Sequence, residues 1–224
     1  MQPFSLTLFK SSNRKVRSGF LFPLAFCFLS VAFYIPPHFS VPVVAQTTDA
    51  RQAEGDRLLE QGIQQFRTRQ FTAALNSGQQ ALQIYRVLKN RRGEGRTLGN
   101  LGLAYHSLGN YAKAFEYWQQ SLDIAREIKD RDAEGWVLDI LGNAYFFLGN
   151  SAKAIEYWQQ SLAVVREIQY RDAEGRMLGR LGMGYGYLGN YAKAIEYSQQ
   201  SLDIAREIKD RQGEGIALGN LGVV

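Results

Sequence analysis

The sequence predicts an all-α protein built from stacked helical repeats, and two observations lead to this prediction. A segment of about forty residues returns along the chain, so that Gly102, Gly142, Gly182 and Gly222 occupy equivalent places. A fixed period of this length is typical of stacked repeat proteins. Within each period apolar residues recur at spacings of three and four, which indicates helices with one buried side.

The first helix of each period carries an apolar stripe with glycines inside it. In the period that starts near Leu98, the stripe continues through Leu101 and Tyr105, and glycines stand at positions 99 and 102. A glycine costs a helix roughly 1 kcal/mol relative to alanine. Because these glycines return in later periods, we expect a neighbouring helix to approach closely at each of them.

A Leu-Gly-Asn sequence separates the first helix of each period from the second. The glycines suit the left-handed residue just past a helix end, and the asparagines suit the N-cap of the next helix; they are Gly109, Gly149 and Gly189, then Asn110, Asn150 and Asn190. The second helix is expected to bury Trp118 and to expose polar residues such as Arg126. A polar D-R-D-A-E-G linker would follow, with Asp132 or Asp172 as the next N-cap.

The order of these residues resembles the tetratricopeptide (TPR) repeat. The pattern is Leu101-Gly102, Tyr105, Ala114, Trp118 and Ser121, and it recurs in register in the next two periods. The forty-residue length is similar to the long-helix repeats of kinesin light chains and Pins-like scaffolds. It also resembles bacterial arrays that precede caspase-like (CHAT) protease domains. The resemblance implies a right-handed α-solenoid whose first helices line a concave, peptide-binding side.

The N-terminal 45 residues differ from the rest of the chain. Four basic residues precede an apolar run at 19–35, and small residues at 43–45 follow. This order is typical of a signal peptide. We therefore expect a signal peptide at 1–45, cleavage near Ala45, and a secreted or periplasmic protein. The alternative is that residues 19–35 remain uncleaved and anchor the chain in a membrane.

The rest of the chain divides by the period. A short polar entry segment at 46–54 precedes a TPR domain at 55–224, with a degenerate repeat at 55–94, three better repeats at 95–134, 135–174 and 175–214, and a partial fifth at 215–224. The partial repeat would leave Ile216, Leu218 and Leu221 incompletely covered. This predicts self-association through that end, or a fragment of a longer repeat protein.

Composition limits the chemistry that the chain could perform. Without residues 1–45 the chain holds 22 Lys and Arg against 21 Asp and Glu, a net charge of +1, so its charge does not indicate nucleic-acid binding. It also holds no cysteine and one histidine, His106, which we expect to be a surface residue or a contact in the binding groove. Dyads of Cys-His type and zinc sites need more such residues. We therefore expect no enzyme, no cofactor and no metal.

The predicted function is a protein-interaction scaffold that holds an extended peptide or a partner domain. By resemblance, the concave side carries residues that vary between repeats: Arg96, Asn100, His106, Trp136, Asp139, Asn143, Phe146, Arg176, Arg180 and Tyr187. Arginines match carboxylates and aromatic residues are favoured anchors, so the expected partner is an acidic, extended segment with an apolar side chain. Asp139 is a discordant negative charge, and the arginines could instead pair with acidic neighbours such as Asp172. The alternative function is the regulatory part of a truncated CHAT-type protease.

Overall fold

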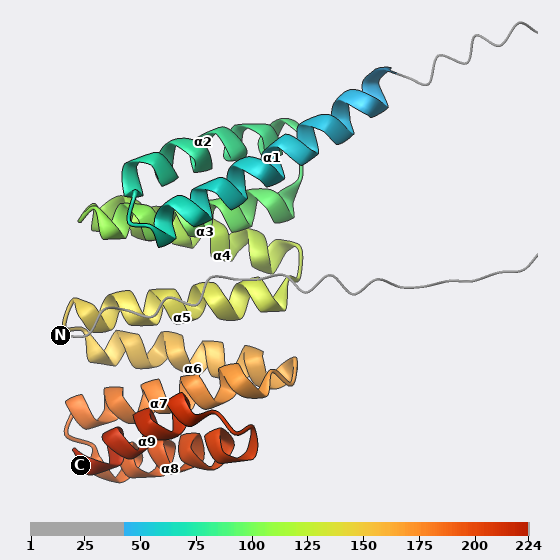
Figure 1. The fold of residues 1–224 in the computed structure, drawn as a ribbon. Helices are drawn as coiled ribbons and strands as arrows, with labels where there is room; N and C mark the ends of the chain where they lie inside the picture. Colours follow the sequence, from blue (N-terminus) through green and yellow to red (C-terminus); the bar gives the residue numbers. More distant parts are fainter. Residues whose placement is uncertain (1–42, 224) are drawn as a thin grey trace, which may run out of the picture.

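The structure, a computed structural model, describes residues 43–223 as an all-α solenoid (Figure 1). Within these residues it contains nine helices and no strand: α1 (Val43–Arg67), α2 (Phe71–Val87), α3 (Arg91–Ser107), α4 (Tyr111–Glu127), α5 (Arg131–Phe147), α6 (Ser151–Glu167), α7 (Arg171–Tyr187), α8 (Tyr191–Glu207) and α9 (Arg211–Gly222). Each helix packs against the next one along the chain. The predicted all-α repeat architecture is therefore confirmed.

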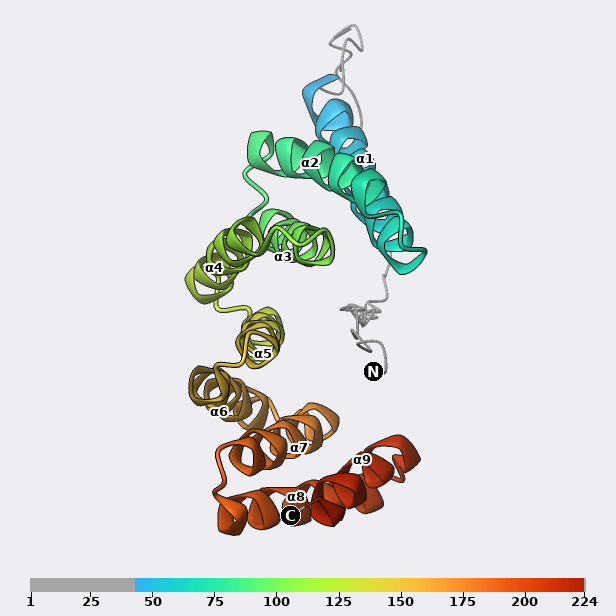
Figure 2. The same ribbon diagram turned by 90° about the vertical axis from the view of Figure 1, so that its left-hand side faces the viewer.

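The helices form an arc with two layers. In the view of Figure 2, α3, α5 and α7 lie on the inner side of the arc, and α4 and α6 lie on its outer side. We call the inner side the concave face, and define it by the surfaces of α3, α5 and α7. The chain thus alternates between an inner and an outer helix, as the forty-residue period requires.

The turns from inner to outer helices follow the predicted chemistry. Gly109 has a φ of 77° and stands just past the end of α3, where a side chain would be strained. The Asn110 side chain then accepts a hydrogen bond from the backbone N–H of Lys113 at 3.2 Å and so caps α4. The same geometry recurs at the two later Leu-Gly-Asn turns.

The turns back from outer to inner helices are shorter than the predicted linker. The helix α5 begins at Arg131, so most of the D-R-D-A-E-G segment forms its first turn. The N-cap is Asp130, whose side chain accepts from Ala133 N at 3.1 Å, and Asp132 lies inside the helix. Asp172 likewise lies inside α7, and its N-cap is Tyr170. The helix pairs therefore begin four residues before the periods counted from the sequence.

The N-terminal part of the chain is only partly described. The segment 46–54, expected as a polar entry segment, belongs to the first helix, α1. Most of the expected signal peptide and its apolar run at 19–35 lie outside the described residues. Among the residues that are described, none of the helices combines the length and apolar character needed to span a membrane.

The core lies between the inner and outer helices of each pair and continues from one pair to the next. The side chains of Trp118 and Trp158 are fully buried, as expected. A methyl group at Gly102 would overlap the Trp118 ring, and one at Gly142 would overlap the Trp158 ring. The glycines inside the inner helices are therefore required by close approach, which outweighs their cost in helix propensity.

A ladder of ion pairs joins successive pairs along one edge. Glu134 at the start of α5 is buried, and it accepts from Arg126 of α4 at 2.9 Å and from Arg131 at 2.7 Å. Glu94 and Glu174 repeat this arrangement with their own two arginines. Burial alone would raise the pKa of Glu134, but the hydrogen bonds from the two arginines outweigh it and hold that pKa below its usual value.

The close contact at Gly102 can be tested by substitution. We expect Gly102→Ala to lower the free energy of unfolding by about 1–3 kcal/mol, because the added methyl overpacks the core against Trp118. Gly219→Ala is the matched control in α9, where an added methyl meets no atom within 4 Å. The control should be neutral or slightly stabilising. Urea unfolding followed by circular dichroism measures both, and equal effects would contradict the packing account.

Candidate functional site

Three predicted site residues bind one another across the concave face. Arg180 of α7 lies 2.8 Å through Nε from Asp139 Oδ1 of α5, and its Nη1 donates to Asn143 Oδ1 at 2.5 Å. Asn143 is buried, and its Nδ2 donates to Asp139 Oδ1 at 3.0 Å. The discordant charge of Asp139 is thus matched within the chain. This cluster ties α5 to α7 and leaves these three side chains little capacity for a partner.

The other predicted polar residues also have partners in the chain. Arg176 forms an ion pair with Asp172 one turn earlier in α7, in agreement with the pairing alternative. Asn100 donates through Nδ2 to the Arg96 carbonyl oxygen of its own helix at 2.8 Å. The Arg176 side chain is one third exposed and its partner is more exposed. Because exposed ion pairs contribute little stability, Arg176 can exchange Asp172 for another carboxylate at small cost.

The predicted aromatic residues differ in how far they are buried. Trp136 of α5 is half-buried against α3, where its ring covers Gly99. Phe146 lies between Trp158 at 5.5 Å and Tyr187 at 4.9 Å, measured between ring centroids. Tyr187 meets Phe146 edge to face and is still 74% exposed. It is therefore the most accessible of the predicted anchors.

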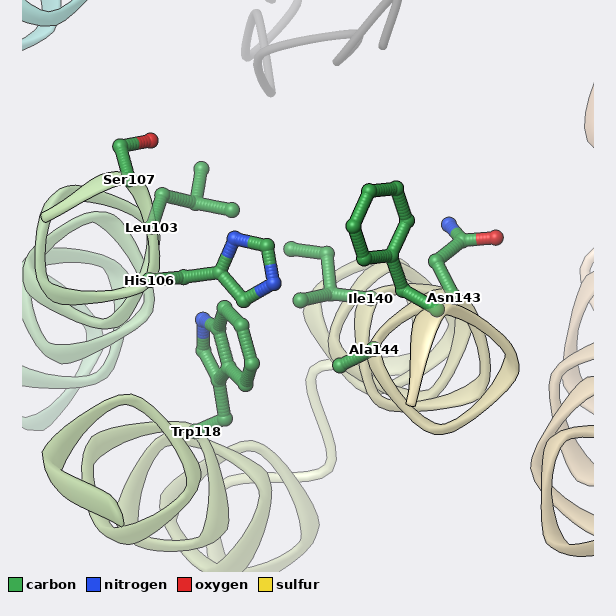
Figure 3. A pocket seen from close by; sticks show the side chains of 8 residues that line it. Leu103, His106, Ser107, Trp118, Ile140, Asn143 and Ala144 are labelled. Atoms are coloured by element: carbon green, nitrogen blue, oxygen red, sulfur yellow. The ribbon is translucent and has the colours of Figure 1, made fainter. Parts of the chain in front are cut away.

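An apolar pocket of about 200 Å³ opens between α3 and α5 (Figure 3). Side chains from both helices form its walls, and the Trp118 ring of α4 lies behind them. The lining residues are Leu103, His106, Ser107, Trp118, Ile140, Asn143, Ala144 and Phe147. Of these, His106 and Asn143 are among the site residues predicted from the sequence. Some residues of the pocket lie forty positions apart in the sequence. The pocket can therefore be recognised only from the structure, which places α3 beside α5.

His106 lies within an aromatic cluster rather than on an open surface. Its ring centroid is 5.2 Å from that of Tyr111 and 5.6 Å from that of Trp118. Burial lowers the pKa of His106 below its ordinary value, because the apolar surroundings disfavour the imidazolium. The imidazole is therefore neutral at pH 7. Residues 43–223 contain no group of three or more His, Cys, Asp or Glu placed to hold a metal ion.

Comparisons with known proteins agree with this architecture. The family model described as tetratricopeptide repeat matches residues 57–127, 95–167 and 174–224. No curated protein matches the chain. At the identities given below, likeness to solved structures concerns the fold alone.

Three solved structures illustrate the likeness. Aspartyl phosphate phosphatase F from Bacillus subtilis has a TM-score of 0.71 at 17% identity, over 73% of this chain and 43% of that one. A Rap protein in complex with competence and sporulation factor has a TM-score of 0.67 at 19% identity, over 72% and 45%. Nearly identical TPR-like repeats ascribed to a kinesin light chain of Podosopora anserina have a TM-score of 0.62 at 17% identity, over 74% and 82%. The chain therefore spans less than half the length of the first two.

The two arginines of α7 should differ in their contribution to stability. We expect Arg180→Ala to lower the free energy of unfolding by about 1–3 kcal/mol, because it leaves the largely buried Asp139 carboxylate without its cation. Arg176→Ala is the matched control, and should change it by less than about 1 kcal/mol because its ion pair is exposed. Urea unfolding of both variants measures the difference. An Arg180 effect as small as that of Arg176 would show that the cluster does not tie α5 to α7.

The protonation of His106 should depend on folding. We expect an NMR titration of the full chain to give His106 a pKa below the ordinary 6.5, and His106→Gln identifies its signals among the two histidines. Since the unfolded state binds the proton more readily, stability is fully present above pH 6.5 and decreases as the pH falls toward the lower folded pKa. The stability of the His106→Gln variant should lack this part of the pH dependence. A His106 pKa at or above 6.5 would contradict the burial of the imidazole.

Proposed function

The chain belongs to the tetratricopeptide repeat family, and we propose that its concave face holds an extended segment of a partner protein. Repeats of this family generally act as non-enzymatic scaffolds for protein interaction, and stacked repeats offer long concave surfaces for that purpose. The similar Rap protein forms a complex with competence and sporulation factor. That fact concerns the Rap protein, and for this chain it only supports the proposal.

The proposal rests on a difference between two kinds of position in the inner helices. Buried positions pack the helices together, and half-buried positions lie on the concave face. Several residues that pack the inner helices are identical between repeats and buried, as Leu101, Leu141 and Leu181 illustrate. The positions five residues earlier on these helices are Arg96, Trp136 and Arg176, and all three are only half-buried. Positions that are only partly buried are less constrained by packing, so they can differ, and their chemistry can serve recognition.

The chemistry of the concave face supports a segment that is acidic and carries apolar side chains. Tyr187 offers an exposed aromatic ring, and aromatic residues are favoured binding anchors. Arg92 at the start of α3 keeps a 70% exposed side chain although it pairs with Asp130 at 3.0 Å. Together with Arg176 it can donate to carboxylates of a partner. Arg180 and Asn143 bind Asp139 and each other within the chain, so we do not propose that they bind the partner.

Other sequence predictions remain proposals. We propose that residues 1–45 direct export of the chain. The exposure of Ile216 and Leu218 in α9 supports the predicted self-association. The alternative that the chain is the regulatory part of a longer protease stays a prediction, since none of the described residues bears on it.

Peptide binding tests the proposed function. The probe is a fluorescein-labelled peptide of seven residues that alternates glutamate and phenylalanine, because extended chains place alternate side chains on opposite sides. We expect saturable binding to the full chain by fluorescence anisotropy. Tyr187→Ala should weaken it several-fold because it removes an exposed anchor from the concave face.

The matched control removes an exposed apolar side chain from an outer helix. Ile195 of α8 is 49% exposed, and Ile195→Ala should leave the affinity unchanged. Unfolding curves of both variants exclude a general loss of structure. The proposal is wrong if the probe does not bind, or if Ile195→Ala weakens binding as much as Tyr187→Ala does.

A further inference from the structure

The side chains that form the pocket between α3 and α5 differ from their equivalents at the next contact of inner helices. Between α5 and α7, Phe146 takes the place of His106 and meets Tyr187 at 4.9 Å, whereas His106 and Phe147 are 6.3 Å apart. Arg180 takes the place of Ile140, and its side chain is held by Asp139 and Asn143. The same region of the fold thus holds larger side chains at the contact between α5 and α7 than at the contact between α3 and α5.

A second difference lies at the rim of the pocket. Ser107 is exposed and lines the pocket, while the equivalent residue in the next pair is Phe147. Because Ser107 is small, it leaves that part of the rim uncovered, whereas Phe147 lines the same pocket from α5. The opening therefore results from specific side chains of the α3 pair, and backbone geometry common to all pairs does not explain it.

The size of the pocket restricts its occupant. Sites for small molecules commonly measure about 300–1,000 Å³, and this pocket measures about 200 Å³. It is therefore suited to one side chain better than to a complete small molecule. Its walls include the aliphatic chains of Leu103 and Ile140, so an apolar group gains most from entering.

The chemistry of the walls favours a ring. The imidazole of His106, the indole of Trp118 and the phenyl ring of Phe147 all line the pocket, and aromatic rings attract one another edge to face. No lining residue is Asp, Glu, Lys or Arg, so a charged side chain would lose its hydration without a matching charge. The Phe146 ring between Trp158 and Tyr187 shows that this fold accommodates a phenyl group in such surroundings.

We infer that the pocket between α3 and α5 receives one aromatic side chain of the segment bound on the concave face. This inference rests on the proposed function and specifies the apolar anchor of the partner. The remaining residues of the segment would extend along the concave face toward Trp136 and Arg176. The pocket then sets the position of the segment, and the rest of the concave face adds contacts.

Two peptides with different central residues test the inference on the full chain. They are acetyl-Glu-Glu-Phe-Glu-Glu-amide and its counterpart with alanine in place of phenylalanine, titrated by calorimetry. Burial of the phenyl ring should make the first bind about tenfold more tightly or more. In Ser107→Phe, which places a large ring at the rim of the pocket, the preference should fall to nearly one.

Ser151→Phe is the matched control, because its equivalents Tyr111 and Tyr191 are aromatic and it lies on the outer helix α6. It should keep the full preference for phenylalanine. Equal affinity of the two peptides for the native chain would overturn the inference while leaving the proposed function intact. A preference that persists in Ser107→Phe would overturn it as well.

Failure of both peptides to bind would contradict the proposed function. In that case a smaller probe tests binding to the pocket independently of the rest of the concave face. N-acetylphenylalanine amide at millimolar concentration should shift the NMR signals of His106 saturably in the native chain. It should not do so in Ser107→Phe, and N-acetylalanine amide should have no effect on either protein. No shift with the phenylalanine compound would overturn the inference independently of the peptides.

Discussion

The structure depends on the close approach of the two helices within each pair. At Gly102 and Gly142 the inner helix has no side chain, and the buried indoles of Trp118 and Trp158 occupy the space. In the last complete pair Ser198 replaces the tryptophan, yet a methyl at Gly182 would still overlap the serine hydroxyl. Because these contacts repeat at a fixed period, they hold each pair in the same internal geometry and leave little freedom for the residues around them.

Contacts between successive pairs then set how the pairs stack. The largely buried carboxylates of the ladder, Glu94, Glu134 and Glu174, each connect an outer helix to the inner helix that follows it. Removal of both partners from such a carboxylate would leave a buried charge, which is costly. With the stack fixed from its edge and its core, the half-buried positions of the concave face are less constrained by packing than the buried ones. One contact of inner helices uses this freedom for the Arg180 cluster, and its neighbour leaves an open pocket.

Local features of the fold could be predicted from the sequence, whereas long-range pairing could not. The glycine turns, the asparagine caps and the buried tryptophans follow from residues close together in the chain. The burial of Glu134 could not be read from a polar D-R-D-A-E-G segment, since it depends on Arg126 in the preceding helix. The Asp139–Arg180 pair joins residues 41 positions apart and occurs in one contact only. The pocket arises from small residues such as Ser107, and the absence of a large side chain gives no periodic signal.

The account claims that repeated residues hold the stack and that variable residues of the concave face recognise the partner. A crystal structure of the full chain with the alternating glutamate and phenylalanine peptide tests this claim most directly. We expect the peptide to lie extended on α3, α5 and α7, with one phenyl ring against Leu103, His106 and Ile140. Side chains of the repeated core should keep their positions. A peptide bound to the outer helices α4, α6 and α8 would contradict the claim.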